Sequence, residues 1–170
     1  MSTPAESSLT LSSLEIASIA DALAMAAPLA AVLGVVDRIA MHRIGTIVFS
    51  ASLCRVDAME VERIYSSRPQ AYAVGVRTNK RQTAWGRQVL QEQKVFVGEG
   101  ALEMAAAFDD KEGMASIGVR SIINVPIVVQ GRCLGVLNFG RGVERVSPSD
   151  VTIARFLSLA ACPAFLATPA

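Results

Sequence analysis

Residues 121–139 read SIINVPIVVQGRCLGVLNF, and this stretch decides the fold. Two apolar runs rich in β-branched residues, 121–129 and 132–139, flank the pair Gln130-Gly131. Such a pair between two strand-like runs favours a tight turn, so the stretch predicts an antiparallel β-hairpin. Pro126 has no backbone N–H to donate, and it therefore predicts an edge position or a bulge in the first strand.

Three further strands are expected upstream of this hairpin. Residues 46–54 are β-branched and roughly alternating, which is typical of a strand. Residues 57–59 predict a turn into a second strand at 61–66, and residues 94–97 predict a short third strand. With the hairpin, the chain is expected to form five strands.

The segment that joins the second strand to the hairpin is unusually long. We call this segment, residues 67–120, the excursion. It contains the short third strand and two helical stretches, at 83–91 and 101–117. Because connections of this length are usually lids or binding loops, the excursion is the first place to expect function.

Helices are predicted at both ends of the chain. Residues 1–12 are expected to be flexible, and Ser12 and Glu15 have the spacing of a capping box that opens a helical region at 13–45. Pro28 fits the first turn of a second helix in that region, and Gly45 fits its left-handed end.

The remaining residues, 46–166, are expected to form the sheet, the excursion and a final helix within one domain. Ser147 and Pro148 supply the cap and first-turn proline of that helix, and Pro163 is expected to end it. The terminal helices are apolar on more than one side, so each must bury two faces. We therefore expect a homodimer in which the terminal helices form a bundle.

Composition excludes several classes of protein. The chain has 170 residues, 52% of them hydrophobic and 18% charged, which fits one folded domain. The formal charge of +1 argues against a nucleic-acid partner. The three cysteines have no CxxC pairing and there is one histidine, so no metal site and no cofactor is predicted. The uncharged stretch 22–36 is too short for a membrane span. A secretory signal begins with basic residues, whereas the first basic residue here is Arg38. We therefore expect a cytoplasmic location.

The order of elements and the hairpin motif together resemble a GAF domain over residues 28–166. The most specific part is S-x-x-N-V-P-I-x-x-x-G-x-x-L-G-V-L-N, which starts at Ser121. The resemblance implies an α+β fold: an antiparallel sheet of five or six strands with helices on both faces. It also implies a small-molecule ligand held non-covalently under the excursion, with a sensing or regulatory role.

The sequence departs from three specialised branches of that family. The excursion has no cysteine for covalent attachment of a bilin. Cyclic-nucleotide binding implies Asn-Lys and Asp-Glu pairs, where this chain has Asn138-Phe139 and Asp150-Val151. Free-methionine-sulfoxide reductases use several thiols in the pocket, whereas the cysteines here fall in two strands and the last helix. A thiol-dependent redox enzyme remains one alternative, and a dimerisation module with no ligand is another.

Charge is distributed unevenly along the chain. Residues 63–91 hold six basic side chains and no acidic one, whereas residues 92–112 hold six acidic and two basic ones. The two halves could pair with one another and with solvent, or some of the cations could hold an anionic ligand. Arginine suits the second role because its planar fork meets a carboxylate or phosphate with two parallel hydrogen bonds.

Candidate ligand-binding residues follow from this charge pattern and from the aromatic and polar side chains. Strand alternation places Arg63 and Tyr65 on one face and Ile64 on the other. The aromatic residues of the excursion could line a pocket or simply attach the excursion to the sheet, and a buried Asn needs partners from the fold or from a ligand. The candidate residues are Arg63, Tyr65, Tyr72, Lys80, Trp85, Phe108, Asp109, Ser121 and Asn124.

Overall fold

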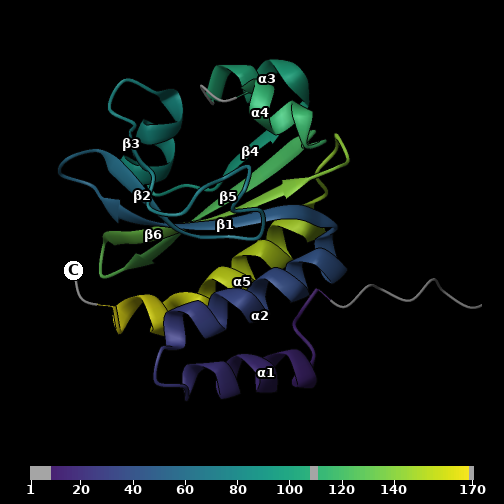
Figure 1. The fold of residues 1–170 in the computed structure, drawn as a ribbon, viewed down its shortest axis with the longest axis vertical. Coiled ribbons are helices and arrows are strands. Elements are labelled where there is room, and N and C mark those ends of the chain that lie inside the picture. Colours follow the sequence, from purple (N-terminus) through teal and green to yellow (C-terminus); the bar gives the residue numbers. More distant parts are fainter. Residues whose placement is uncertain (1–8, 108–110, 169–170) are drawn as a thin grey trace, which may run out of the picture.

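The chain folds around one six-stranded antiparallel sheet with strand order β3-β2-β1-β6-β5-β4 (Figure 1). The computed structural model describes residues 9–107 and 111–168. The predicted hairpin is confirmed and lies inside the sheet. The strands are β1 (Thr46–Arg55), β2 (Glu60–Ser66), β3 (Arg77–Asn79), β4 (Phe96–Glu99), β5 (Ser121–Val129) and β6 (Arg132–Arg141).

Helices cover both faces of the sheet, as expected of an α+β fold (Figure 1). The long terminal helices lie on one face, and the short helices of the excursion lie on the other. The first group comprises α1 (Ser13–Leu23), α2 (Pro28–Ile44) and α5 (Pro148–Leu166). The second comprises the π-helix η1 (Gly86–Gln91), α3 (Gly100–Ala107) and α4 (Lys111–Ser116).

The predicted helix boundaries are largely confirmed. Ser12 and Glu15 make both hydrogen bonds of the capping box at the start of α1. Gly45 ends α2 in the left-handed conformation, with φ of 64°, where a side chain would be strained. Pro163 lies inside α5 instead of ending it, because the helix continues to Leu166.

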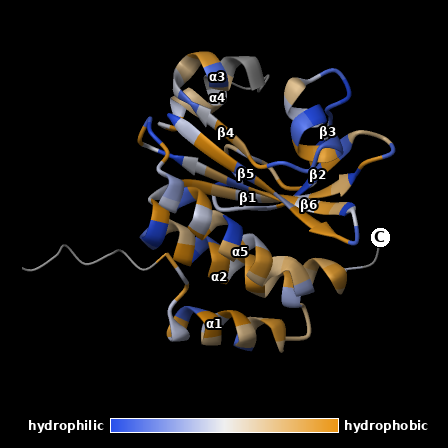
Figure 2. Cartoon of the chain, turned by 180° about the vertical axis from the view of Figure 1, so that it is seen from behind, coloured by the Kyte–Doolittle hydropathy of each residue, from blue (hydrophilic) through white to orange (hydrophobic). Residues whose placement is uncertain are grey.

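The main core lies between the sheet and the layer formed by α2 and α5. Phe49 and Phe139 are fully buried there, with ring centroids 5.2 Å apart. Figure 2 shows apolar residues along the helices of this layer. Gly135 permits the close contact with α5, because a Cβ at this position would overlap the Phe165 ring.

The second face of the α2/α5 layer is partly covered by α1 of the same chain. Ile19 and Ala22 of α1 are buried in the main core cluster. Part of the apolar surface that suggested a dimer is therefore covered within the chain, while Leu159 of α5 remains 69% exposed. By length and hydropathy alone α5 could cross a membrane, but its buried side packs against the sheet as a core helix.

The structure differs from the sequence prediction in and around the excursion. An additional strand, β3, pairs its three residues with Glu60–Glu62 of β2. The third predicted strand is displaced to Phe96–Glu99, and the described part of the helical stretch 101–117 forms α3 and α4. Pro126 lies beyond the part of β5 that pairs with β4, so its missing N–H falls on an uncovered edge, as predicted.

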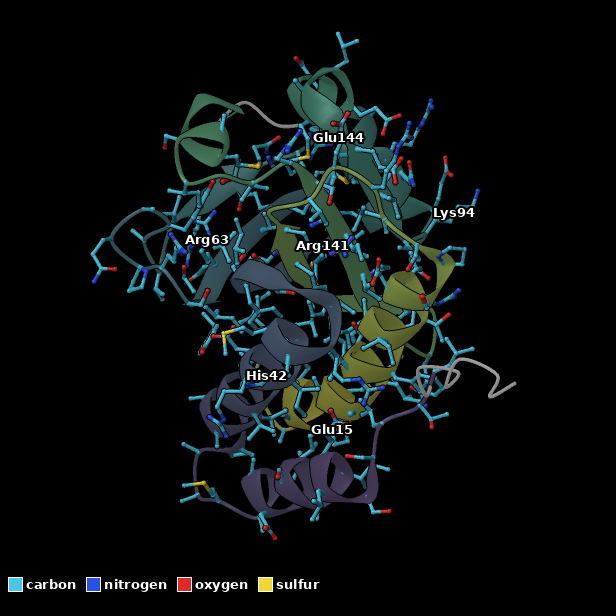
Figure 3. The ribbon with its side chains drawn as sticks, turned by 90° about the vertical axis from the view of Figure 1, so that its right-hand side faces the viewer. Glu15, His42, Arg63, Lys94, Arg141 and Glu144 are labelled. Carbon is cyan, nitrogen blue, oxygen red and sulfur yellow. The ribbon has the colours of Figure 1, made fainter. Side chains whose placement is uncertain are left out.

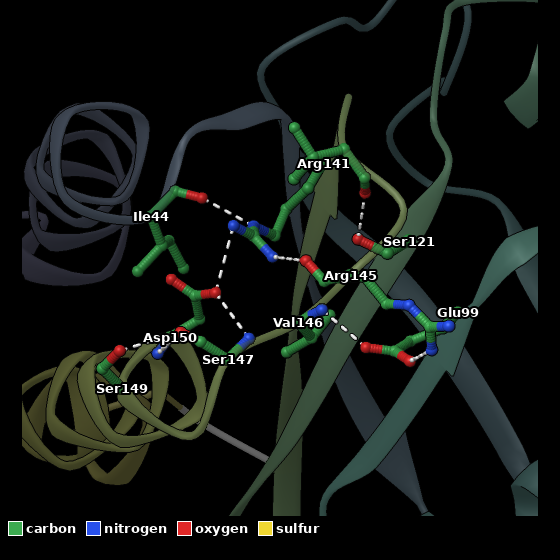
Figure 4. Close-up of polar contacts among 10 residues, drawn as sticks. Ile44, Glu99, Ser121, Arg141, Arg145, Val146, Ser147, Ser149 and Asp150 are labelled. Atoms are coloured by element: carbon green, nitrogen blue, oxygen red, sulfur yellow. Dashed lines mark hydrogen bonds and ion pairs between the residues drawn. The ribbon is translucent and has the colours of Figure 1, made fainter.

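A buried guanidinium joins the end of the sheet to both long helices (Figure 4). The Arg141 side chain donates to the Ile44 carbonyl at the end of α2 and lies 3.1 Å from Asp150 at the start of α5. It also donates to the Arg145 carbonyl in the connecting loop. Because every direction of its planar fork contacts the protein, Arg141 stabilises the fold and is directed away from the excursion.

Candidate functional site

A cavity lies between the sheet and the excursion, on the face opposite the terminal helices. It offers about 110 Å3 in which the centre of a water-sized sphere can move. One water needs about 10–15 Å3 on this measure, so the cavity has room for a small organic molecule. Its walls come from β1, β2, β5, β6 and the excursion: Val48, Ser50, Ser52, Val61, Arg63, Tyr72, Thr78, Lys80, Trp85, Met114, Val119, Ile122, Asn124, Asn138 and Gly140.

Arg63 reaches this cavity because β2 contains a bulge. Ala51 pairs with Tyr65 and the next residue, Ser52, pairs with Arg63, so Ile64 is the extra residue on β2. An extra residue reverses the alternation of side chains beyond it. Arg63 therefore lines the cavity, and Figure 3 shows it on the far side of the sheet from His42 and Glu15 of the terminal helices.

The Arg63 guanidinium is held by the first part of the excursion. Its Nη1 donates to the Ala73 carbonyl at 3.1 Å, and its Cζ lies 5.1 Å from the centroid of the Tyr72 ring. A cation over an aromatic face is attracted by the ring quadrupole. These contacts orient the guanidinium at the cavity wall.

Lys80 supplies a second cation, from the segment that follows β3. The residue is only 9% exposed, and its Nζ lies 5.7 Å from the centroid of the Trp85 ring. Gly86 permits this arrangement, because a Cβ on Gly86 would overlap the Lys80 carbonyl oxygen. The start of η1 is thus packed directly over the lysine backbone.

A chain of hydrogen bonds crosses the floor of the cavity. Trp85 Nε1 donates to Asn124 Oδ1 at 3.0 Å, and Asn124 Nδ2 donates to Asn138 Oδ1 at 2.6 Å. Asn138 Nδ2 then donates to the hydroxyl of Ser50 at 3.2 Å and to the Ser50 carbonyl. Asn124 is fully buried, and the fold itself satisfies its amide. Its role in the site is therefore to position Trp85, as well as to line the cavity.

The described lining of the cavity includes two basic side chains. Two basic side chains, Arg63 and Lys80, face it from the sheet edge and from the excursion. No Asp or Glu is present among its described lining residues. Ser52 and Thr78 add hydroxyl groups, which donate to oxyanions as readily as they accept.

The structure brings together five of the nine candidate residues. Arg63, Tyr72, Lys80, Trp85 and Asn124 all line the cavity. Phe108 and Asp109 lie outside the described residues. The other two candidates, Tyr65 and Ser121, lie elsewhere.

The expectation that Tyr65 shares a face with Arg63 is wrong. The bulge at Ile64 turns Tyr65 toward α2, where its hydroxyl donates to Asp37 Oδ2 at 3.0 Å and its ring lies 5.6 Å from that of Phe49. Burial and the neighbouring Asp37 carboxylate raise the pKa of Tyr65 to about 12. Tyr65 therefore belongs to the helix side of the sheet.

Ser121 is also not a cavity residue. It is fully buried, and its hydroxyl donates to the Val143 carbonyl at 2.6 Å (Figure 4). Conversely, sequence reasoning missed Ser50, Ser52 and Asn138 as lining residues. The signal was present, because alternation along β1 places the two serines on one face of an otherwise apolar strand.

Several charged residues of the excursion form ion pairs in the described part of the chain. Arg87 lies 3.7 Å from Glu92, where the basic half of the excursion meets the acidic half. Arg77 pairs instead with Glu62 of β2, and Glu99 pairs with Arg145 beyond the hairpin. Among the described residues, the charged side chains of the excursion thus pair both within it and with the sheet and the loop that follows β6.

Comparison with known proteins identifies the family. The family profile of the GAF domain matches residues 19–162, so the chain belongs to the GAF domain family. No curated protein matches the chain.

Solved structures share the fold at low sequence identity. One is the GAF domain of a phosphoenolpyruvate-protein phosphotransferase from Coxiella burnetii, with 16% identity, a TM-score of 0.67, and 87% of this chain and 89% of that chain covered. Another is the free methionine-R-sulfoxide reductase of Neisseria meningitidis in complex with its substrate, with 15% identity, a TM-score of 0.65, and 92% and 93% covered. A third is the GAF domain of a two-component sensor histidine kinase from Bacillus halodurans, with 16% identity, a TM-score of 0.56, and 75% and 92% covered.

Proposed function

We propose that this GAF domain binds a small anionic organic molecule non-covalently in the cavity under the excursion, as a sensing or regulatory step. The observation that carries the proposal is the pair of cations, Arg63 and Lys80, on a cavity whose described lining has no acidic residue. The fold class supports the regulatory part, because similar structures include the GAF domain of a sensor histidine kinase.

The walls of the cavity define the ligand further. Tyr72 and Trp85 offer aromatic surface beside the two cations. A pocket that combines apolar walls with a few placed polar groups suits a ligand with an apolar body and one polar end. A carboxylate fits Arg63 best, since a guanidinium fork can donate two parallel hydrogen bonds to it.

Binding is favoured over thiol chemistry at this site. No cysteine is present among the described residues that line the cavity. A reductase that acts on a bound sulfoxide needs a thiolate within reach of the ligand, because the thiolate is the nucleophile. We therefore do not carry the activity of the structurally similar reductase to this cavity.

A thermal-shift and calorimetric screen of small carboxylates, with and without an aromatic ring, tests the proposal. A ligand at about 100 times its Kd adds about 2.7 kcal/mol to the free energy of unfolding, which is a readily measured rise in Tm. Arg63→Met and Lys80→Met should each weaken binding about 10- to 100-fold, because a hydrogen bond to a charged group contributes about 1.5–3 kcal/mol.

Arg77→Met is the matched control. Arg77 belongs to the same basic segment but pairs with Glu62 at 2.8 Å and does not line the cavity. It should leave the affinity unchanged. A screen in which no carboxylate raises the Tm, or in which the Arg77 variant loses as much affinity as the Arg63 variant, would contradict the proposal.

A further inference from the structure

Two of the three cysteines lie side by side at the end of the sheet, away from the ligand cavity. Cys54 is near the end of β1, and Cys133 is at the start of β6. The two side chains pack in the same apolar cluster and line the same surface hollow. Cys162, in contrast, is on α5, where it packs against the main core on the other face of the sheet.

The strand register explains why the two cysteines meet. Leu53 pairs with Gly135, so Cys54 lies opposite the residues just before Gly135. Against β5, Ile127 pairs with Gly135 and Val128 with Cys133, so Leu134 is an extra residue on β6. This bulge turns Cys133 toward the excursion face, where it packs with Val136 and with Cys54.

The spacing of the two strands suits a disulfide. Neighbouring strands lie about 4.7–4.9 Å apart, and residues one step apart along the strand add about 3.3 Å. Two cysteines that are neighbours across such a pair have Cα atoms about 6 Å apart, within the usual disulfide range of 4.4–6.8 Å. Both side chains already point to the same face.

The two thiols also border a surface hollow with basic residues on its rim. Its lining includes Cys54, Cys133, Arg55, Arg132 and Asp57. Cys54 is partly exposed and Cys133 is 4% exposed, so a small polar oxidant would reach the pair through this hollow. Arg55 and Arg132 line this hollow as well and give it positive charge.

The protonation of the pair is asymmetric. The neighbouring Cys54 thiol lowers the pKa of Cys133. The same contact with Cys133, together with burial, raises the pKa of Cys54. Cys133, whose Sγ donates to the Gly135 carbonyl at 3.5 Å, is thus the thiol with the lower pKa of the two.

We propose that Cys54 and Cys133 form a redox-active dithiol that closes reversibly to an intramolecular disulfide when a hydroperoxide reaches the hollow. The Cys133 thiolate attacks a peroxide oxygen, the O–O bond breaks, and a sulfenic acid forms on Cys133. The Cys54 sulfur then attacks the Cys133 sulfur, the S–S bond forms, and water leaves with the Cys54 proton. With hydrogen peroxide, the two sulfurs lose two electrons and the peroxide becomes two waters.

The peptide map of the oxidised protein tests this directly. The native protein is treated with hydrogen peroxide, blocked with an alkylating agent and digested with trypsin. Cleavage after Arg43, Arg55, Arg132 and Arg141 separates the two cysteines into peptides 44–55 and 133–141. We expect these two peptides to be joined and two hydrogens lighter, with one thiol of the three remaining free on Cys162.

Three variants assign the roles of the sulfurs. Cys54→Ser should leave a sulfenic acid on Cys133 that dimedone traps, because the resolving thiol is absent. Cys133→Ser should lower the rate at which peroxide oxidises the protein thiols by at least about tenfold, since thiolate character controls reactivity. Cys162→Ser is the matched control and should give the same joined peptides as the wild type.

Several results would overturn the proposal. All three thiols could survive peroxide that oxidises free cysteine under the same conditions, or the recovered disulfide could join Cys162 residues of two chains. Equal dimedone labelling of Cys54 and Cys133 in the two single variants would refute the assignment of Cys133 as the nucleophile. Loss of ligand binding would not bear on this proposal, because the cavity and the hollow have separate linings.

Discussion

The buried amide of Asn124 allows a quantitative test of the cavity floor. Asn124→Leu keeps roughly the same shape but removes the acceptor of Trp85 Nε1 and the donor to Asn138 Oδ1. A buried polar group left without a partner costs about 1–3 kcal/mol. Two such groups should lower the free energy of unfolding by about 2–6 kcal/mol, and each kcal/mol should lower the Tm by roughly 2–4 °C in a chain of this size.

A double-mutant cycle isolates the contribution of the indole. Trp85→Phe removes the N–H, so in the combined Trp85→Phe, Asn124→Leu variant no indole donor is left unsatisfied. The combined loss of stability should therefore be smaller than the sum of the single losses by about 1–3 kcal/mol. Urea unfolding followed by far-UV circular dichroism measures all four proteins without relying on the one tryptophan.

Additivity would refute the reasoning. If the two single losses sum to the double loss within about 0.3–0.5 kcal/mol, Trp85 and Asn124 are energetically independent. The hydrogen bond between them would then not hold the indole at the cavity wall. A change in the slope of the urea dependence would show instead that the unfolded or native ensemble had changed.

Three further expectations follow from other parts of the fold. Tyr65→Phe should lower the free energy of unfolding by about 1 kcal/mol at pH 7 and leave ligand affinity unchanged. Burial raises the pKa of Asp37 and the Tyr65 hydrogen bond opposes that rise, so the cost of the substitution should shrink toward pH 4, where the Asp37 carboxyl is increasingly protonated. Urea unfolding at both pH values measures this difference. Gly86→Ala should lower the free energy of unfolding, measured by thermal unfolding, by about 1–3 kcal/mol, because the new Cβ would overlap the Lys80 carbonyl oxygen. Gly34→Ala, within α2, should raise it by up to about 1 kcal/mol, because the new Cβ would contact only the end of the Arg38 side chain. Sedimentation velocity should give a particle of twice the 18.0 kDa chain mass. Leu159→Arg should shift the protein toward the monomer, because Leu159 is exposed on α5. A wild-type protein that is monomeric at micromolar concentration would contradict the predicted dimer.

Local patterns were sufficient to predict the parts of the fold that local physics determines. The β5–β6 hairpin follows from two apolar runs around Gln130-Gly131, and Gln130 indeed adopts a positive φ of 50°. The capping box at Ser12 follows from spacing alone, and the cap at Ser147 follows from the serine and proline that begin α5. β3 could not be predicted, because its three polar residues become a strand only by pairing with β2.

The site was predictable where it depends on residue type and not where it depends on register. Arg63, Lys80 and Trp85 stood out as charged or aromatic residues next to a long connection. The bulge at Ile64, which reverses the faces to which the side chains of β2 point, has no sequence signature, because nothing in the alternation of β2 marks an extra residue. Asn138 lies in an apolar strand, but only the cross-strand pairing with Asn124 shows that it reaches the cavity.

The bulge in β2 has a mechanical consequence for the ligand binding that we propose. Arg63 at the cavity and Tyr65 at the helix layer are two residues apart on one strand. A ligand that pulls on the guanidinium therefore also moves the main chain that holds the phenol against Asp37 of α2. Because packed interiors transmit strain, these two residues of β2 connect the cavity mechanically to the terminal helices.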